Sequence, residues 1–226
     1  MNFQTLVSKV SFGTKGFDIV PNYNKGPILI LKNKYDSESI IENKIKKLSS
    51  ETIEVINIET NETKKITPTK FINKFSNLNF KIIFAIGGGS IIDFAKRIVL
   101  ELKVINKTKI EFYVLPTRLG SGAESSHTSI LNINNKKIFD VNNEFIPDGV
   151  IYYTKFYREL SYHQLIMGAI DAIMHCIESS LSFNDNYFSN YLSKSTMKFI
   201  LENKSIYKLI NNSELEDDDF KNLCIL

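Results

Sequence analysis

The sequence predicts an α/β fold, in which helices cover a parallel sheet, followed by a shorter all-helical part. Up to about residue 160, short apolar β-branched runs alternate with segments of helical periodicity, which is the order that a parallel sheet requires. From Ser161 onward the apolar residues recur at helical spacing, and no proline follows Pro147. We therefore expect an α/β domain at residues 1–160 and a partial helical domain at residues 161–226.

The first part contains four apolar runs that predict buried strands and three segments that predict the helices between them. The strands are expected at 28–31, 53–58, 81–86 and 112–115. The first helix is expected to be capped by Ser37 and to bury Ile40, Ile41, Ile45 and Leu48. The second carries Phe71, Ile72, Phe75 and Leu78, and the third has its apolar stripe between Ile91 and Leu102.

Beyond Gly120 the pattern predicts a hairpin, a further strand and then helices. Residues 129–133 and 136–139 flank an Asn-Asn pair, which favours a tight antiparallel turn. A strand is expected at 150–153, with helices at 162–180 and 187–202 and the start of another at 220–226. The acidic run at 214–219 is expected to be a solvated segment.

Charge and composition exclude several classes of protein. The 28 basic and 25 acidic residues give a net charge of +3, too balanced for a dedicated nucleic-acid binder. The longest uncharged run, residues 82–92, is far shorter than the roughly 20 apolar residues of a membrane-spanning helix, and residues 1–12 show no signal-peptide pattern. Cys176 and Cys224 are too few for a disulfide framework. We expect a cytoplasmic protein with no nucleic-acid or membrane partner.

A glycine-rich turn is the first candidate binding feature. Gly87, Gly88, Gly89 and Ser90 stand between a predicted strand and a predicted helix. Glycines let a backbone approach an anion closely, and a helix start offers unpaired N–H groups, so this turn predicts a phosphate or pyrophosphate cradle. It matches neither the GxGxxG fingerprint nor a P-loop. The alternative is a tight turn in which Ser90 simply caps the helix.

A second loop, residues 116–124, follows the next predicted strand and combines two glycines with hydroxyl side chains. Thr117 and Ser121 could donate to phosphate or ribose oxygens from the carboxyl edge of the sheet. The alternative is a loop without a binding role.

Asp171 and His175 form the third feature, because residues at i and i+4 share one face of a helix. A carboxylate and an imidazole at this spacing can bind one divalent metal ion. The neighbouring isoleucines favour a covered site, and the alternative is a surface Asp–His contact. Of the other two histidines, His127 is a candidate for the same cleft and His163 is expected to be a capping or surface residue.

Together these stretches resemble the iron-containing alcohol dehydrogenase family. Residues 87–96 repeat the family pattern GGGSxxDxAK, and residues 116–124 resemble PTTxGTGSE with Arg118 for a Thr and Ala123 for a Ser. Residues 169–178 resemble the metal helix GxDAxxHxIE, with Ala169 for the Gly, and Phe12-Gly13 resembles an N-terminal FG motif. Within the family, residues 166–207 look most like the branch that includes phosphonoacetaldehyde reductases.

The resemblance implies a Rossmann-like, dehydroquinate synthase-like domain and an NAD(P)-dependent oxidoreductase that interconverts an alcohol and an aldehyde or ketone. A divalent metal, Fe²⁺ or Zn²⁺, would act as Lewis acid. It implies that residues 87–90 hold the pyrophosphate of NAD or NADP and that the nucleotide site is lined by Asp93, Thr117, Arg118 and Ser121. Asp171 and His175 would ligate the metal, with no catalytic residue beyond it, and a homodimer is expected.

The sequence departs from the family at two places that bear on the site. The family's metal site uses one Asp and three His, whereas no histidine follows His175 here, so we expect a C-terminally truncated member. The alternative is a non-catalytic nucleotide-binding fragment without a complete metal site. Lys32 and Asn33 stand where the family often has an acid that selects NAD, which leaves NADP open. A dehydroquinate synthase or glycerol dehydrogenase type enzyme is disfavoured by the spacing of Asp171 and His175.

Overall fold

The computed structural model describes residues 9–20, 26–33, 39–48, 53–58, 68–73, 78–182 and 187–224. The chain divides into two compact units. The first comprises residues 1–117 and 123–153, and the second comprises residues 118–122 and 154–226. No helix among the described residues is long and apolar enough to cross a membrane.

The first unit is built on a six-stranded sheet with the order β1-β8-β5-β4-β2-β3. Its strands are β1 (Val10–Phe12), β2 (Ile28–Asn33), β3 (Ile53–Ile58), β4 (Ile82–Gly87), β5 (Glu111–Pro116) and β8 (Gly149–Tyr152). All neighbouring strands in it run parallel. The sheet confirms the predicted fold class, and it places the carboxyl ends of β4 and β5 side by side, with Gly87 opposite Pro116.

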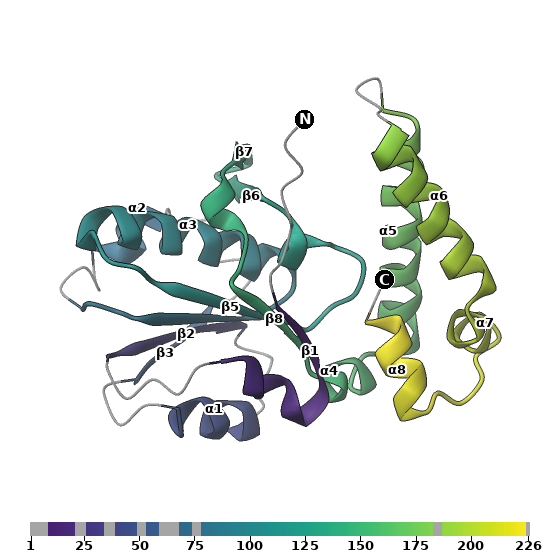
Figure 1. Cartoon of the computed structure of the whole chain (residues 1–226), viewed down its shortest axis with the longest axis horizontal. Helices are drawn as coiled ribbons and strands as arrows, with labels where there is room; N and C mark the ends of the chain where they lie inside the picture. The colour runs from purple at the N-terminus through teal and green to yellow at the C-terminus, as the bar shows by residue number, and fades with distance from the viewer. Residues whose placement is uncertain are drawn as a thin grey trace. The chain divides into compact units, whose positions relative to one another are not determined.

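Helices cover both faces of this sheet, with α1 (Ser39–Lys46) on one face and α2 (Pro68–Ile72) and α3 (Gly89–Asn106) on the other (Figure 1). Every residue of β4 is buried because both faces of the sheet are covered, and the strand is accordingly apolar along its whole length. The short 3₁₀ segments are η1 (Gly13–Ile19), η2 (Ala123–Ser125) and η3 (Asn143–Phe145). The apolar stripe of α3 packs into the core formed with β4 and β5.

A two-stranded hairpin, β6 (Thr128–Ile133) and β7 (Lys136–Val141), lies against α3 (Figure 1). Asn134 and Asn135 adopt left-handed φ values of 51° and 62°, as a two-residue hairpin turn requires. The structure thus confirms the predicted hairpin. Leu131 and Ile133 of β6 join the apolar core of this unit.

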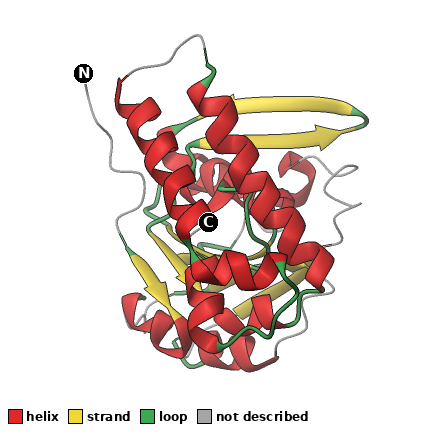
Figure 2. Cartoon of the chain, turned by 90° about the vertical axis from the view of Figure 1, so that its right-hand side faces the viewer, coloured by secondary structure: helices red, strands yellow, loops and turns green. Residues whose placement is uncertain are grey.

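The second unit has helices as its only regular elements among the residues that the structure describes. It contains α4 (Thr154–Arg158), α5 (Tyr162–Ser180), α6 (Tyr187–Glu202), α7 (Lys204–Ile210) and α8 (Asp217–Leu223). α5 and α6 lie side by side (Figures 1 and 2). Ser161 caps the start of α5: its hydroxyl accepts from the Gln164 N–H in a capping box. Its buried face is made of small and apolar residues: Leu165, Gly168, Ala169, Ala172 and Cys176.

Within the second unit α4 packs on α8, where Arg158 pairs with Asp217 and its guanidinium lies 5.6 Å from the Phe220 ring centroid. The predicted domain boundary at residue 160 stays a prediction. One expectation needs correction in part: most of the acidic run is exposed, as expected, but its last residue, Asp219, is buried in the first turn of α8. The predicted Ser37 cap and Phe75 lie outside the described residues.

Candidate functional site

The glycine-rich turn joins β4 to α3. Gly87 ends the strand, Gly88 is the N-cap residue in an extended conformation, and Gly89 begins the helix. The cap residue is therefore Gly88 and not Ser90, and it provides no side-chain hydrogen bond. The first-turn N–H groups of an α-helix have no acceptor within it, so those of Gly89 and Ser90 are suited to an anion.

Close packing explains why a glycine ends the strand. A Cβ on Gly87 would lie 2.7 Å from the Ile91 Cβ, so a larger residue would force the turn away from the helix. On the neighbouring strand end, the Thr117 N–H donates to the Gly87 carbonyl at 3.1 Å. The start of the second loop is thereby fixed beside the cradle, as the parallel register predicts.

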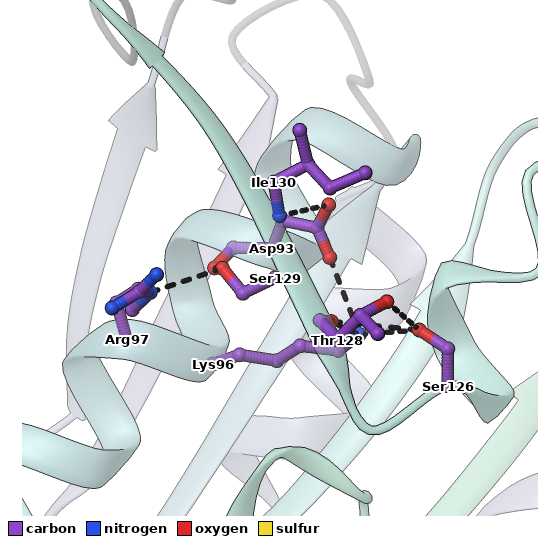
Figure 3. Close-up of polar contacts among 7 residues, drawn as sticks. All are labelled: Asp93, Lys96, Arg97, Ser126, Thr128, Ser129 and Ile130. Carbon is purple, nitrogen blue, oxygen red and sulfur yellow. Dashed lines mark hydrogen bonds and ion pairs between the residues drawn. The ribbon is translucent and has the colours of Figure 1, made fainter. Parts of the chain in front are cut away.

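Asp93 lies one turn into α3 and is half-buried. One of its carboxylate oxygens accepts from the Ile130 N–H at 3.1 Å and the other lies 3.2 Å from Lys96 Nζ (Figure 3). Burial raises the pKa of Asp93, and the Lys96 charge opposes that rise. The carboxylate is therefore engaged in holding β6 to α3, and its contact with a nucleotide stays a prediction.

Residues 118–122 of the second loop pack on α5 through two glycines. Gly120 has a φ of +87°, and a Cβ there would lie 2.2 Å from Gly168 O and 2.9 Å from the Asp171 Cβ. A Cβ on Gly168 would lie 2.6 Å from the Leu119 Cβ. The loop can lie this close only because both residues are glycines. Sequence reasoning missed Gly168, although it directly precedes Ala169, where the family pattern has its glycine.

Asp171 and His175 lie together on α5, as the spacing predicts. His175 Nε2 is 4.0 Å from Asp171 Oδ1, and His175 Nδ1 lies 3.0 Å from the Gly120 carbonyl oxygen. Because a carbonyl can only accept, Nδ1 carries a proton, so the lone pair of the neutral tautomer lies on Nε2. This second contact orients the ring as it does in metal-binding histidines.

The donor set fits a divalent metal in part. Zinc lies about 2.0–2.2 Å from nitrogen and carboxylate ligands in tetrahedral sites, so the two donors, 4.0 Å apart, would bind one ion after a small approach of their side chains. Imidazole and carboxylate also suit Fe²⁺. No group of three or more His, Cys, Asp or Glu side chains that could hold a metal occurs among the described residues. The pair therefore accounts for two coordination positions.

The pair was expected to face a covered site, but the side chains of Asp171 and His175 are 52% and 51% exposed. Ile170 and Met174 beside them are also exposed, since the buried face of α5 is the opposite one. A cleft of about 500 Å³ lies along this exposed face. It is lined by α5 residues between His163 and Met174, Asp171 included, and by Arg118 and Leu119.

Of the remaining predicted residues, Thr117 and Lys32 are buried and the others are accessible. Ser121 and Arg118 are half-exposed, and His127 is exposed just before β6. Lys32, near the end of β2, stands in register with Ile86, one residue before the cradle, and its ammonium pairs with Glu42 of α1. The position at which an acid was expected from the family pattern is therefore occupied by Lys32, whose ammonium forms an ion pair with Glu42.

Comparison with known proteins shows the family. The model of the iron-containing alcohol dehydrogenase family matches residues 8–154. The 4-hydroxybutyrate dehydrogenase of Clostridium kluyveri is 27% identical over 142 residues, which cover 58% of this chain and 38% of that protein. The probable alcohol dehydrogenase EutG of Escherichia coli is 25% identical over 142 residues, covering 57% and 35%.

The fold has close counterparts among solved structures. An iron-containing alcohol dehydrogenase of Thermotoga maritima superposes with a TM-score of 0.78 at 21% identity, covering 99% of this chain and 66% of that one. The chain thus spans less than two thirds of the length of these relatives. Since the family model matches more than half of the sequence, the chain belongs to the iron-containing alcohol dehydrogenase family.

Proposed function

We propose that the chain supplies the nucleotide-binding unit and two metal ligands of an NAD(P)-dependent oxidoreductase that interconverts a small alcohol and an aldehyde or ketone. The observation that carries the proposal is the arrangement of His175. Its Nδ1 is held by the Gly120 carbonyl while its Nε2 faces Asp171, which is the orientation that a metal ligand needs. Family membership supports the same reading.

Asp171 and His175 would hold the divalent cation, Fe²⁺ or Zn²⁺. A cation bound there would polarise a carbonyl oxygen as a Lewis acid. Gly120 and Gly168 keep the loop against α5, so the imidazole is oriented before a ligand arrives. Because a preorganised side chain loses less conformational freedom on binding, the orientation of His175 strengthens its binding of the cation.

The nucleotide would bind at the start of α3. The N–H groups of Gly89 and Ser90 would donate to its pyrophosphate, and Thr117 and Ser121 would donate hydroxyl groups nearby, with Asp93 and Arg118 completing the site. The nicotinamide would accept or deliver the hydride. Lys32 and Asn33, in place of the acid that would select NAD, leave NADP open beside NAD. We also propose that the protein is cytoplasmic, because its free cysteines Cys176 and Cys224 fit a reducing compartment. We propose further that it forms a homodimer.

Gly88→Asp tests the nucleotide site. Asp is a favoured N-cap residue, and the extended conformation of Gly88 accepts it, so the thermal midpoint should be retained or rise. The new carboxylate would occupy first-turn N–H groups and repel a phosphate, so fluorescence titration should show at least about tenfold weaker NADH or NADPH binding. Gly88→Asn caps without the charge and should weaken binding less. Unchanged affinity in Gly88→Asp would place the nucleotide elsewhere.

Turnover tests the reaction itself. Oxidation of NADH or NADPH by short aldehydes is measured after loading with Fe²⁺ or Zn²⁺, in wild type and in Asp171→Ala. Metal-dependent turnover that Asp171→Ala abolishes supports the oxidoreductase. Nucleotide binding without turnover in any metal form would instead favour the alternative, a nucleotide-binding chain without catalysis.

A further inference from the structure

Lys96 carries a charge with no exposed surface. Its ammonium lies 3.2 Å from Asp93 Oδ1, 3.1 Å from Ser126 Oγ and 2.6 Å from the Thr128 carbonyl oxygen (Figure 3). An ammonium has three N–H donors, so these three acceptors satisfy it. The motif GGGSxxDxAK includes this lysine, but neither the nucleotide cradle nor the metal pair gives it a role.

Stability alone does not account for a charge at this position. Taking an ion out of water costs several kcal/mol, and apolar residues of similar size often replace buried ion pairs without loss of stability. Burial lowers the pKa of Lys96, and the neighbouring Asp93 charge opposes that change. Glu124, whose pKa is raised by burial, also lies close enough to act on Lys96. The buried ion pair is therefore weak evidence for a stabilising role, and the contacts of Lys96 point to another one.

The partners of Lys96 lie where the second loop ends. Ser126 and Thr128 follow that loop, and two further bonds join the next residues to α3: the Ile130 N–H donates to Asp93 Oδ2 at 3.1 Å and the Ser129 hydroxyl to the Asp93 carbonyl at 2.9 Å. At the other end of the loop, Thr117 is bonded to Gly87. One end of the loop is thus attached to the end of β4, and the segment after its other end is attached to α3.

We propose that Lys96 is a positioning residue for nucleotide binding, because it fixes the segment in which the second loop ends against the helix that begins at the glycine cradle. The proposal rests on the proposed function. Lys96 has no surface with which to touch a nucleotide, so it acts through Ser126 and Thr128. Without the ammonium, these acceptors lose their donor and residues 123–130 can move relative to α3.

Lys96→Met tests the proposal, with Lys103→Met as a matched control. Lys103 lies on the same helix and pairs with Glu144 at 2.7 Å, away from the second loop. NADH and NADPH affinities are measured for each variant at a temperature the same number of degrees below its own unfolding midpoint. A loss of stability alone then does not change the measured affinity. Amide hydrogen exchange of residues 117–130 is followed without nucleotide. Ser126→Ala, a milder change, covers the case in which Lys96→Met does not fold.

Lys96→Met is expected to bind nucleotide about tenfold more weakly, equivalent to about 1.4 kcal/mol, and to exchange faster at residues 123–130. Ser126→Ala should also weaken nucleotide binding and speed exchange at residues 123–130, but by less. Lys103→Met should change neither the affinity nor the exchange. Wild-type affinity in Lys96→Met, or equal losses in Lys96→Met and Lys103→Met, would overturn the proposal. If wild type binds neither nucleotide, the proposed function fails, and the exchange data alone decide whether Lys96 anchors the segment.

Discussion

Replacing Gly120 by alanine should destabilise the second unit and weaken metal binding at the same time. The left-handed backbone alone costs an L-residue about 1–2 kcal/mol. A Cβ at 2.2 Å from Gly168 O cannot be accommodated without movement, and such overpacking typically costs about 1–3 kcal/mol more. Because the Gly120 carbonyl accepts from His175 Nδ1, any movement that relieves the clash displaces the group that orients the imidazole.

Gly122 provides the matched control. Its φ of +59° is also left-handed, but a Cβ there would meet nothing within 4 Å, so Gly122→Ala should cost only the about 1–2 kcal/mol of backbone strain. Urea unfolding should show a loss of about 2–5 kcal/mol for Gly120→Ala. Titration with Zn²⁺ should show about 10–100-fold weaker binding for Gly120→Ala and wild-type binding for Gly122→Ala. Equal stabilities and equal affinities in the two variants would refute a role for Gly120 in orienting His175.

Three further outcomes are expected. Asp171→Asn and His175→Ala should each lower Zn²⁺ affinity by at least about tenfold in a chelator competition, with little change in Tm, because both side chains are half exposed. Ile83→Ala, in the fully buried strand β4, should lower the free energy of unfolding in urea by about 2–5 kcal/mol. Desolvation raises the pKa of Asp219, but hydrogen bonds from Lys208, the Glu216 N–H and Ser205 outweigh it and hold that pKa below its ordinary value. The stability that Asp219 contributes is therefore complete above its unfolded-state pKa and is lost as the pH falls through the lower folded-state pKa, so wild type should lose more stability than Asp219→Asn as the pH falls below about 4.

Local patterns predicted most elements of this fold because the interactions that form them are local. The helices expected at 162–180 and 187–202 match α5 and α6, whose faces follow from apolar spacing. The hairpin turn was predictable because asparagine tolerates left-handed φ values. β1 was not predicted, since it has three residues and a mostly exposed pattern. Its partner, β8, lies near the other end of the first unit's sequence, so only the folded sheet brings the two together.

The candidate site divides in the same way. The positions of Asp171 and His175 on one face of α5 follow from helical spacing alone, but their exposure depends on what packs over that face. The role of Gly168 was not predicted, because the residue it packs against, Leu119, is distant in the sequence. Lys96 is the clearest case: a lysine on an amphipathic helix is expected on the solvated face, and it is buried here because residues 126–130 lie across that turn of α3. A sequence pattern therefore cannot predict the contacts between distant segments. In this protein one such contact joins Lys96 of α3 to Thr128, just after the second loop, and another joins the Gly120 carbonyl, within that loop, to His175.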